Sequence, residues 1–348
     1  MKSTIMDYRR RTGRRIPLLC LALLLLVAGG CAKDTDSAAE PVSGSQAETD
    51  RRPLTVMLDW YPNAVHSFLY AAVEEGYFAD EGLDVTIQMP ADSNDALKLV
   101  AAGKADLALS YQPQVLMARG EGIPVTSIAA LVRHPLNHLL VPQSSGITRP
   151  GELAGRSAGF SSIPLYEAML KAMVQYDGGD PDSLDMIDVG WDLIPAITTK
   201  RVDGIIGGFI NHEALLLAKE GVPVTSFDPT DYGVPDYYEL VLVAGESGLQ
   251  ESQEEFSAFL RAARKGQQYV AEHPQDALEL LLAQQDETAP LERDIEARSL
   301  ELLLPLMDAG DQPFGYQDAA VWQEVAEWLK QGGLLENEVA SGDAFVNL

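Results

Sequence analysis

Two kinds of hydrophobic pattern alternate along the chain from residue 54 to residue 131. Short apolar runs rich in β-branched residues predict strands, and the segments between them repeat apolar residues every three or four positions, as one face of a helix does. Such alternation predicts right-handed βαβ units around a largely parallel sheet. The predicted strands are 54–60, 83–89, 105–111 and 125–131, and the helices between them end near residue 78 or cover 94–103 and 112–122.

The same alternation restarts after an apolar strand at 136–142, and this restart predicts a second lobe. Its predicted strands are 156–160, 183–190, 202–209 and 222–227, and its predicted helices are 164–176, 193–200 and 212–221. A strand at 238–245 would return the chain to the first lobe. The remaining segments have helical periodicity and are 254–284, 292–307 and 318–335.

The pattern therefore predicts an α/β protein of two lobes, each a mixed sheet flanked by helices. We expect residues 54–141 to begin lobe 1, residues 142–238 to form lobe 2, and residues 239–348 to complete lobe 1 with the return strand and the C-terminal helices. Two lobes joined by two crossings make a hinged clamp with one ligand cleft between them.

The first 31 residues read as an export signal, because a basic start is followed by a short apolar run and small residues. The ending VAGGC resembles the lipobox of bacterial lipoproteins, which predicts lipid attachment at Cys31; a soluble secreted protein is the alternative. Residues 32–52 are polar and predict a flexible tether. Beyond Cys31 the chain has no cysteine, which excludes disulfides, thiol catalysis and zinc-thiolate sites from the mature protein.

Composition and charge narrow the class of partner. With 46% hydrophobic and 22% charged residues over 348 positions, the chain reads as globular and long enough to bury a sizeable core. Its formal net charge of −27 argues against a nucleic-acid partner. Such acidity suits a solvated extracytoplasmic protein.

Candidate site residues follow from the topology, because ligands of open α/β sheets bind beyond the carboxyl ends of strands. Five segments in such positions are polar or aromatic. Taken singly, Asp59 or Asn211 could be a cap or turn residue, and a tryptophan could be a core residue. Because such polar or aromatic residues recur at five strand ends, we favour a ligand pocket over separate structural roles. The candidates are Asp59, Trp60, Asn63, His66, Tyr111, Gln112, Glu167, Trp191, Asn211 and Glu213.

Charge at these strand ends points to a class of ligand. The nearest basic residues are Arg133, Lys200 and Arg201, whereas a doubly charged anion would favour an arginine fork. Aromatic rings can stack on a flat heterocycle, and carboxylates can accept hydrogen bonds from its amino and ring N–H groups. The residues therefore favour an amino-bearing heterocycle.

Enzymatic and metal-binding interpretations have weaker support. His134 and His138 are spaced for a metal site on a helix, but Pro135 favours a loop that enters a strand. His212 and Glu213 begin a zincin-like motif, yet Leu216 occupies the position of its second histidine. A GxSxG pattern occurs at residues 155–159, GRSAG, but it opens a predicted strand and does not lie between a strand and a helix, as the nucleophile of a hydrolase does. No nucleotide-binding motif of the GxGxxG or GxxxxGK[ST] type occurs. We expect no catalytic residue, no metal and no cofactor.

Seven motifs together resemble the NMT1/THI5-like group of periplasmic-binding-type proteins, and most of all its ThiY-like substrate-binding lipoproteins. The similarity covers roughly residues 54–275 in motif order. Two of the motifs, GYFADEGLDV and AAGKAD, are common to many substrate-binding proteins, and the others are more selective. The motifs are DWYPNAVH, GYFADEGLDV, AAGKADLALSYQ, SIPLYEA, DVGWDLIPAI, VDGIIGGFINHE and DYGVPDYYELV.

This resemblance implies a type II two-lobed clamp that delivers a formylated aminomethylpyrimidine, a thiamine precursor, to an ABC permease with its ATPase. It adds Tyr238 and Glu239 of the return crossing to the candidate ligand-binding residues, and it implies a monomer anchored outside the cell membrane by its N-terminal lipid. A tryptophan and a tyrosine would stack on the ring, a carboxylate would read its amidine-like edge, and Asn or His would contact the formamide.

Departures from the family pattern leave other ligands open. The family often reads PNTNHTG where this chain has PNAVHSF, so Val65 and Phe68 replace Asn and Gly. Relatives carry riboflavin and other heterocycles, and more distant ones carry alkanesulfonates. Enzymatic relatives that make the pyrimidine phosphate have a cysteine cluster, which this chain lacks. A pyrimidine-synthesis enzyme of the THI5 type is therefore the least favoured alternative.

Overall fold

Five strands form the first sheet, in which one strand runs against its neighbours. In the computed structural model, which describes residues 51–92, 95–285 and 290–348, β1 pairs in parallel with β2 and β3, while β10 is antiparallel to β3 and β4. All residues of β4 and β10 are buried, as expected for apolar runs in strands covered on both faces. The spatial order is β2 (Leu83–Gln88), β1 (Arg52–Met57), β3 (Leu107–Ser110), β10 (Leu240–Gly245) and β4 (Val125–Val132).

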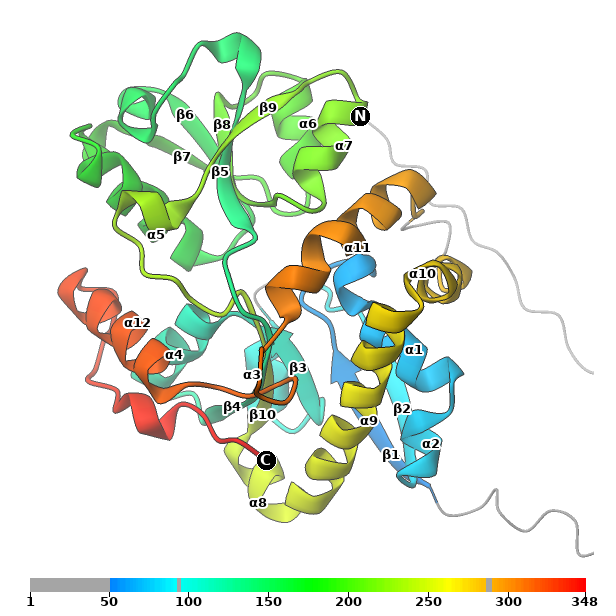
Figure 1. Ribbon diagram of the computed structural model, residues 1–348. Coiled ribbons are helices and arrows are strands. Elements are labelled where there is room, and N and C mark those ends of the chain that lie inside the picture. Colours follow the sequence, from blue (N-terminus) through cyan, green and yellow to red (C-terminus); the bar gives the residue numbers. More distant parts are fainter. Residues whose placement is uncertain (1–50, 93–94, 286–289) are drawn as a thin grey trace, which may run out of the picture. The chain divides into compact units, whose positions relative to one another are not determined.

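The second sheet repeats this topology. Here β6 pairs in parallel with β7 and β8, and β5 is antiparallel to both β8 and β9 (Figure 1). Both sheets are mixed and flanked by helices, which confirms the predicted α/β class. The spatial order is β7 (Asp185–Asp188), β6 (Ser157–Phe160), β8 (Gly204–Phe209), β5 (Asn137–Pro142) and β9 (Val224–Phe227).

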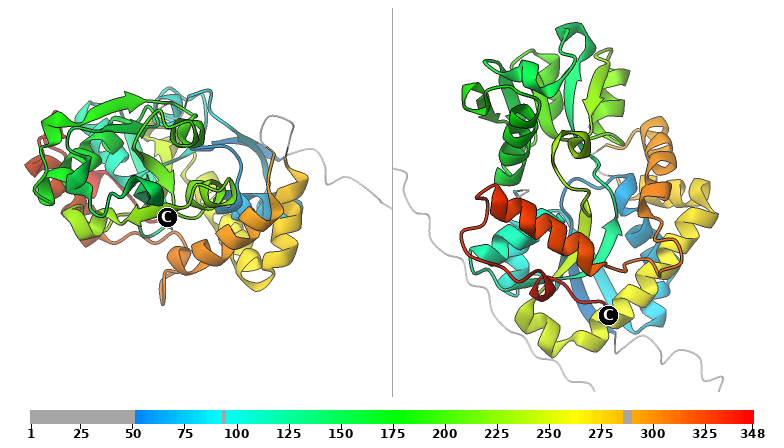
Figure 2. Two further views of the ribbon diagram at one scale, coloured as in Figure 1. Left: turned by 90° about the horizontal axis from the view of Figure 1, so that it is seen from above. Right: turned by 60° about the vertical axis from the view of Figure 1, so that its left-hand side comes forward.

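Lobe 1, the lobe of the first sheet, carries most of the helices. Helices α1, α2, α9 and α10 pack together beside β1 and β2, and α12 packs on α4 (Figures 1 and 2). At Gly266 of α9 a Cβ atom would lie 2.2 Å from the carbonyl oxygen of Phe68, so only glycine permits this close approach to α1. The helices are α1 (Ser67–Glu74), α2 (Tyr77–Asp80), α3 (Ala96–Ala101), α4 (Gln112–Gly120), α8 (Glu246–Glu251), α9 (Gln253–Glu272), α10 (Pro274–Ala283), α11 (Arg293–Met307) and α12 (Ala319–Gln331).

Lobe 2, the lobe of the second sheet, has fewer helices packed on its sheet than lobe 1 has. Helix α5 (Pro164–Tyr176) packs on β8, and α6 (Leu193–Thr198) and α7 (Glu213–Lys219) pack on each other and on the same strand. A separate apolar cluster lies under α6 and α7, whereas the buried side chains of α5 join the large core that continues into lobe 1.

The chain crosses between the lobes at residues 133–136 and 233–239, and each crossing leads into an antiparallel strand. The first crossing lies earlier than expected: Asn137–Pro142 belongs to the second sheet, so the predicted lobe boundary at residue 141 is wrong by one strand. An apolar run looks the same in either sheet, and its partner strands decide its lobe. The return strand joins the first sheet, as expected.

Two smaller differences concern the N-terminal part of lobe 1. Strand β1 begins at Arg52, inside the expected tether, and ends at Met57, three residues before the predicted end at residue 60. The predicted export signal, Cys31 and tether residues 32–50 lie outside the described residues. Within the part that the structure describes, no helix combines the length and apolarity required to cross a bilayer.

Candidate functional site

The lobe 1 wall of the cleft centres on Asp59, which follows β1 and is 2% exposed. Its Oδ1 lies 3.0 Å from Nε2 of His66, and its Oδ2 accepts a hydrogen bond from the Tyr111 hydroxyl at 3.0 Å. Burial, followed by the negative charge of Asp59, raises the pKa of Tyr111 well above its ordinary value, so the hydroxyl stays protonated and donates. The carboxylate is thus held by two side chains and keeps further lone pairs for a ligand.

Asn63 builds the turn behind this wall. Its Oδ1 accepts from the Val65 N–H at 3.0 Å, and its own N–H donates to Nδ1 of His66 at 3.2 Å, which makes a capping box on the short 3₁₀ helix η1 (Ala64–His66). Because Nδ1 of His66 accepts, its Nε2 must carry the proton that is donated to Asp59. Both ring nitrogens of this fully buried histidine are therefore occupied.

The lobe 2 wall comes from the ends of β6 and β8. It consists of Ser161, Tyr166, Gly207, Phe209, His212 and Glu213. Glu213, the first residue of α7, accepts from the Phe209 N–H at 2.8 Å through Oε2 and contacts Nδ1 of His212 at 3.0 Å through Oε1. A Cβ atom at Gly207 would meet the Tyr166 ring at 2.8 Å, so glycine is needed where this ring crosses the strand.

Three aromatic rings meet across the cleft. The ring of Trp191, from the loop after β7, lies 4.2 Å from that of Trp60 and 4.7 Å from that of Tyr61, measured between centroids. Trp60 and Tyr61 belong to lobe 1 and make an edge contact with each other. Such pairs add to the burial of the rings and hold the two lobes close at this edge of the cleft.

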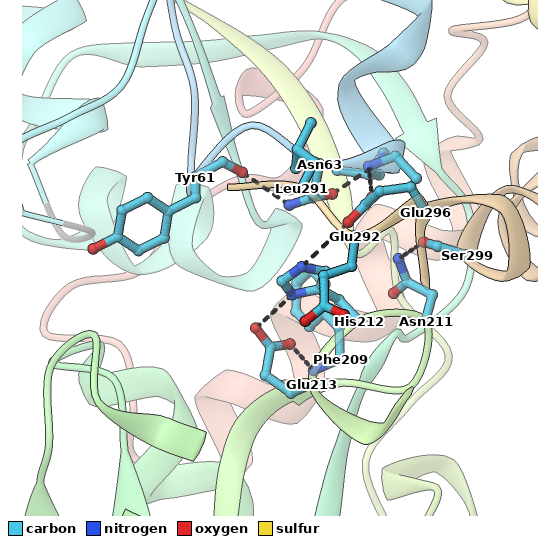
Figure 3. A network of polar contacts seen from close by, with 12 residues as sticks. Tyr61, Asn63, Phe209, Asn211, His212, Glu213, Leu291, Glu292, Glu296 and Ser299 are labelled. Atoms are coloured by element: carbon cyan, nitrogen blue, oxygen red, sulfur yellow. Dashed lines mark hydrogen bonds and ion pairs between the residues drawn. The ribbon is translucent and has the colours of Figure 1, made fainter. Parts of the chain in front are cut away.

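His212 also connects lobe 2 to α11 of lobe 1. Its Nε2 lies 3.8 Å from Oε1 of Glu296, whose Oε2 accepts from the Ala64 N–H at 2.7 Å (Figure 3). Burial lowers the pKa of His212, but the carboxylates of Glu213 and Glu296 outweigh it, and the net shift is upward. Burial raises the pKa of Glu296, and the charge of His212 opposes that shift.

The cavity between the two walls is lined by Asp59, Trp60, Asn63, Tyr111, Ser161, Tyr166, Gly207, Phe209, His212 and Glu213. This set contains two carboxylates and four aromatic rings but no lysine or arginine. The wall therefore presents hydrogen-bond acceptors and flat apolar faces, which suit a neutral or cationic ring better than an anion.

Five of the predicted site residues line this cavity: Asp59, Trp60, Asn63, Tyr111 and Glu213. Two others lie beside it. Trp191 stacks on Trp60, and Asn211 is buried with its Nδ2 donating to Ser299 at 2.9 Å. His66 stands behind Asp59 and does not line the cavity, because both its nitrogens are used to hold the wall.

Glu167 and Tyr238, both predicted to face the ligand, point elsewhere. Glu167 pairs with Lys171 at 2.7 Å in a groove between α5 and α12, because it lies one helical step round from Tyr166, which takes the cavity-facing position. The Tyr238 hydroxyl accepts from the Asp318 N–H, and the Arg133 guanidinium lies 5.1 Å from its ring centre.

The side chains of Gln112 and Glu239 do not line the cavity and instead accept hydrogen bonds from the backbone of the crossings. Oε1 of Gln112 accepts from the Tyr238 N–H at 2.8 Å. Oε2 of Glu239 accepts from the Leu136 and Asn137 N–H groups at 2.7 and 2.8 Å and from the Tyr237 hydroxyl at 3.1 Å, so one carboxyl ties both crossings together. Burial raises the pKa of Glu239 to about 7.

Several residues at the site were not predicted. Tyr166 and Phe209 lie within segments that the strand-end rule selected, next to residues that were chosen, so the signal for them was present. His212 lies between the predicted residues Asn211 and Glu213, in a segment that the same rule selected. Glu296 and Ser299 had no signal of this kind, because they come from a C-terminal helix far along the chain.

No metal site accompanies these residues within the ranges that the structure describes: no three His, Cys, Asp or Glu side chains gather in a way that could hold an ion. His138 lies on β5 with its Nδ1 2.6 Å from the Ser226 hydroxyl, so the HPLNH stretch leads into a strand, as predicted. His134 contacts Asp236 at the surface.

Comparison with known proteins identifies relatives over nearly the whole chain. A formylaminopyrimidine-binding protein of Halalkalibacterium halodurans is 44% identical over 95% of this chain and 98% of its own length. A 4-amino-5-hydroxymethyl-2-methylpyrimidine phosphate synthase of Legionella pneumophila is 26% identical over 84% of this chain and 91% of its own.

Solved structures share the fold at low identity. The alkanesulfonate-binding protein SsuA of Xanthomonas axonopodis pv. citri, bound to MOPS, superposes with a TM-score of 0.67 at 13% identity, over 85% of this chain and 98% of its own. The model of the family described as NMT1/THI5 like matches residues 63–277, which is more than half of the chain. The protein belongs to the NMT1/THI5-like family, as its motifs predicted.

Proposed function

We propose that this protein captures a formylated aminomethylpyrimidine outside the cell and delivers it to the permease of an ABC importer, without making or breaking a bond. The observation that carries the proposal is the 44% identity, over almost the full length of both chains, to a formylaminopyrimidine-binding protein. The acceptors and aromatic rings that line the cavity between the lobes suit this class of ligand in their chemistry.

The lining residues suggest a role for each part of the ligand. An aminopyrimidine offers N–H donors along one edge, and the carboxylates of Asp59 and Glu213 are acceptors on opposite walls. Trp60, Tyr111 and Tyr166 provide faces and edges for stacking on the ring. Asn63 and His212 are the remaining polar side chains with an amide or imidazole, and we assign them to the formamide.

Alkanesulfonates are the less favoured ligands. A sulfonate carries a full negative charge and would face two buried carboxylates with no guanidinium or ammonium group in the lining. The structural likeness to a sulfonate-binding protein supports the clamp fold, and the wall chemistry argues for a different solute.

A synthase activity is also less favoured. The sequence contains two cysteines, Cys20 and Cys31, both within the predicted export signal and its end, so a cysteine cluster like that of the enzymatic relatives cannot be formed. Purified protein incubated with pyridoxal phosphate, iron and oxygen is expected to release no pyrimidine phosphate; release detected by mass spectrometry would overturn the binding-only assignment.

Location and partners follow from the N-terminal sequence. We propose that Cys31 receives a lipid and that residues 32–50 tether a monomer to the outer face of the cell membrane, where a permease can receive the ligand. Cys31→Ala is expected to leave a protein that no longer labels with palmitate, whereas globomycin, which blocks signal-peptide cleavage after lipid transfer, is expected to leave a longer precursor that still labels. Unchanged palmitate labelling of the Cys31→Ala protein would contradict the anchor.

The ligand can be tested directly. Native mass spectrometry identifies what co-purifies, and a thermal-shift panel compares the formylated aminomethylpyrimidine with riboflavin and MOPS. At a hundred times its dissociation constant a ligand adds about 2.7 kcal/mol to stability, a shift of several degrees in Tm. A rise in Tm with MOPS or riboflavin and none with the pyrimidine would show that the proposed ligand is wrong.

Two matched variants separate the pocket from the surface. Glu213→Gln removes a wall carboxylate, and Glu167→Gln makes the same change at an exposed glutamate of the same lobe. Loss of a charged acceptor to the ligand is expected to weaken pyrimidine binding by about tenfold to hundredfold for Glu213→Gln, with less than twofold change for Glu167→Gln. Equal effects would place the ligand elsewhere.

A further inference from the structure

We propose that Glu296 is a positioning residue that joins the two walls of the pocket, and that Glu296 and Ser299 of α11 form a latch that closes on lobe 2. The inference rests on the proposed function only for the identity of the ligand. The latch itself is a property of the lobes and can be examined without any ligand.

The lobe 1 side of the latch is a buried hydrogen bond. Oε2 of Glu296 accepts from the Ala64 N–H at 2.7 Å, and Glu296 is 1% exposed. Ala64 follows Asn63, a pocket residue, at the start of η1. Glu296 therefore fixes the backbone on which part of the lobe 1 wall is built.

The lobe 2 side of the latch is His212. Oε1 of the same Glu296 lies 3.8 Å from Nε2 of His212, while Nδ1 of His212 contacts Glu213 at 3.0 Å. The imidazole thus stands between one carboxylate of each lobe and lines the pocket at the same time. Through these two oxygens a single side chain contacts both walls.

Ser299 adds a second contact on the same helical face, one turn after Glu296. Its hydroxyl accepts from Nδ2 of Asn211 at 2.9 Å, and both residues are fully buried (Figure 3). At the outer end of the same interface Lys219 of α7 pairs with Glu292 and Asp294. That pair is exposed and adds little, so the buried contacts carry the latch.

The energetics make such a latch conditional. Opening the lobes returns His212 and Glu296 to water, and closing them removes both side chains from water. The free energy lost by this desolvation is about as large as the free energy gained from their attraction. The pair therefore selects one closed geometry without locking it. Ligand contacts to the same wall then tip the balance toward closure.

The test uses the full chain and three variants, and a final comparison adds His212→Gln with and without Glu296→Gln. Glu296→Gln keeps an oxygen for the Ala64 N–H and removes the charge beside His212. Ser299→Ala removes the contact to Asn211. Glu301→Gln, at an exposed glutamate of the same helix paired with Arg298, is the matched control. All four proteins are compared by hydrogen exchange without ligand and by calorimetric titration with the formylated aminomethylpyrimidine.

Without ligand, we expect faster amide exchange at residues 206–214 of lobe 2 in Glu296→Gln and Ser299→Ala, and no change in Glu301→Gln. A role of Glu296 confined to lobe 1 would change exchange near Ala64 and leave 206–214 as in the wild type. Unchanged exchange at 206–214 in both latch variants would overturn the proposal.

With ligand, we expect Glu296→Gln to weaken binding about tenfold, and to have no further effect in a His212→Gln background, because it acts through His212. Additive losses would overturn the positioning role. If the latch variants show the exchange effect but the wild type does not bind the pyrimidine, the ligand assignment fails and the latch stands. If the wild type binds the pyrimidine and the latch variants show no exchange effect, the latch fails and the ligand assignment stands.

Discussion

The two sheets share one topology and differ in how deeply they are buried. In each, three parallel strands are followed by an antiparallel strand that arrives from a crossing, and a fifth strand closes the edge. One edge strand of lobe 1, β4, is buried throughout, whereas β2 at its other edge and β7 and β9 at the two edges of lobe 2 are mostly half-buried or exposed. The shared strand order therefore brings the pocket residues of each lobe to corresponding strand ends. The difference in burial implies that the two lobes differ in stability.

This difference implies that lobe 1 carries most of the free energy of unfolding and that the edges of lobe 2 open locally at lower cost. The pocket takes residues from both lobes, so it joins a rigid wall to a more easily deformed one. Four sets of variants can test that comparison.

The largest effect is expected from truncating an inner strand of the lobe 1 sheet, compared with an edge strand of the lobe 2 sheet. Leu242 of β10 is 1% exposed and pairs with Leu109, so Leu242→Ala leaves a cavity and should cost about 2–5 kcal/mol. Ile187 of β7 is half-buried, and Ile187→Ala should cost roughly 1–2 kcal/mol. Urea unfolding measures both, and equal losses would remove the proposed asymmetry.

The second effect concerns Glu239, at the junction of the lobes. Its pKa is raised from 4.5 to about 7, so the folded state holds a proton that the unfolded state releases, and its contribution to stability falls as pH rises from about 4.5 to about 7. The loss should reach roughly 3 kcal/mol at most. In Glu239→Gln this loss is absent.

Unfolding at pH 5 and pH 8 measures the difference. Glu167→Gln serves as control, since it makes the same change at a carboxyl of lobe 2 that pairs with Lys171 away from the crossings. If Glu239→Gln loses as much stability between the two pH values as the wild type, the buried carboxyl does not change its protonation between them.

The third comparison adds one methyl group to each lobe. At Gly266 a Cβ atom would meet the Phe68 carbonyl oxygen at 2.2 Å, so Gly266→Ala should destabilise lobe 1 by about 1–3 kcal/mol despite the better helix propensity of alanine. At Gly159 of β6 the nearest side-chain atoms are 3.4 Å away, an ordinary contact. Gly159→Ala should change stability by less than about 0.5 kcal/mol. Thermal unfolding measures the loss of stability in each variant, and equal losses would contradict the expected difference between the two positions.

The smallest effect concerns the aromatic contact across the cleft. Trp60 lines the cavity and Trp191 stacks on it from lobe 2, so Trp60→Ala should weaken pyrimidine binding more than Trp191→Ala, which should cost about tenfold. Trp328→Ala on α12, outside the cavity, is the control. A larger loss for Trp191→Ala would make lobe 2 the main aromatic wall.

Much of the fold was predictable because burial on both faces of a sheet produces continuous apolar runs. Strands such as β4 and β10 stand out for this reason. Which sheet a strand joins is not encoded in its own pattern, and this explains the misplacement of Asn137–Pro142. Helix α8 was missed because its sequence, ESGLQE, has no apolar periodicity.

The pocket was predictable to the level of segments and less well to the level of side chains. The strand-end rule selected SIPLYE, but the turn of α5 decides that Tyr166 faces the cavity and Glu167 faces Lys171. Alternation along the return crossing likewise turns Tyr238 toward Asp318. Glu296 required tertiary structure, because only the docking of α11 brings it to His212.

The position of β10 between β3 and β4 has a consequence for the order of folding. Strands β1 to β4 are complete by residue 132, yet their sheet remains open in the middle until residues 240–245 have been made and inserted. Lobe 2, by contrast, uses only residues 137–227 for its sheet. Non-local strand pairing is slow, so the smaller, less buried lobe should acquire its structure first during synthesis and the larger one should wait for it.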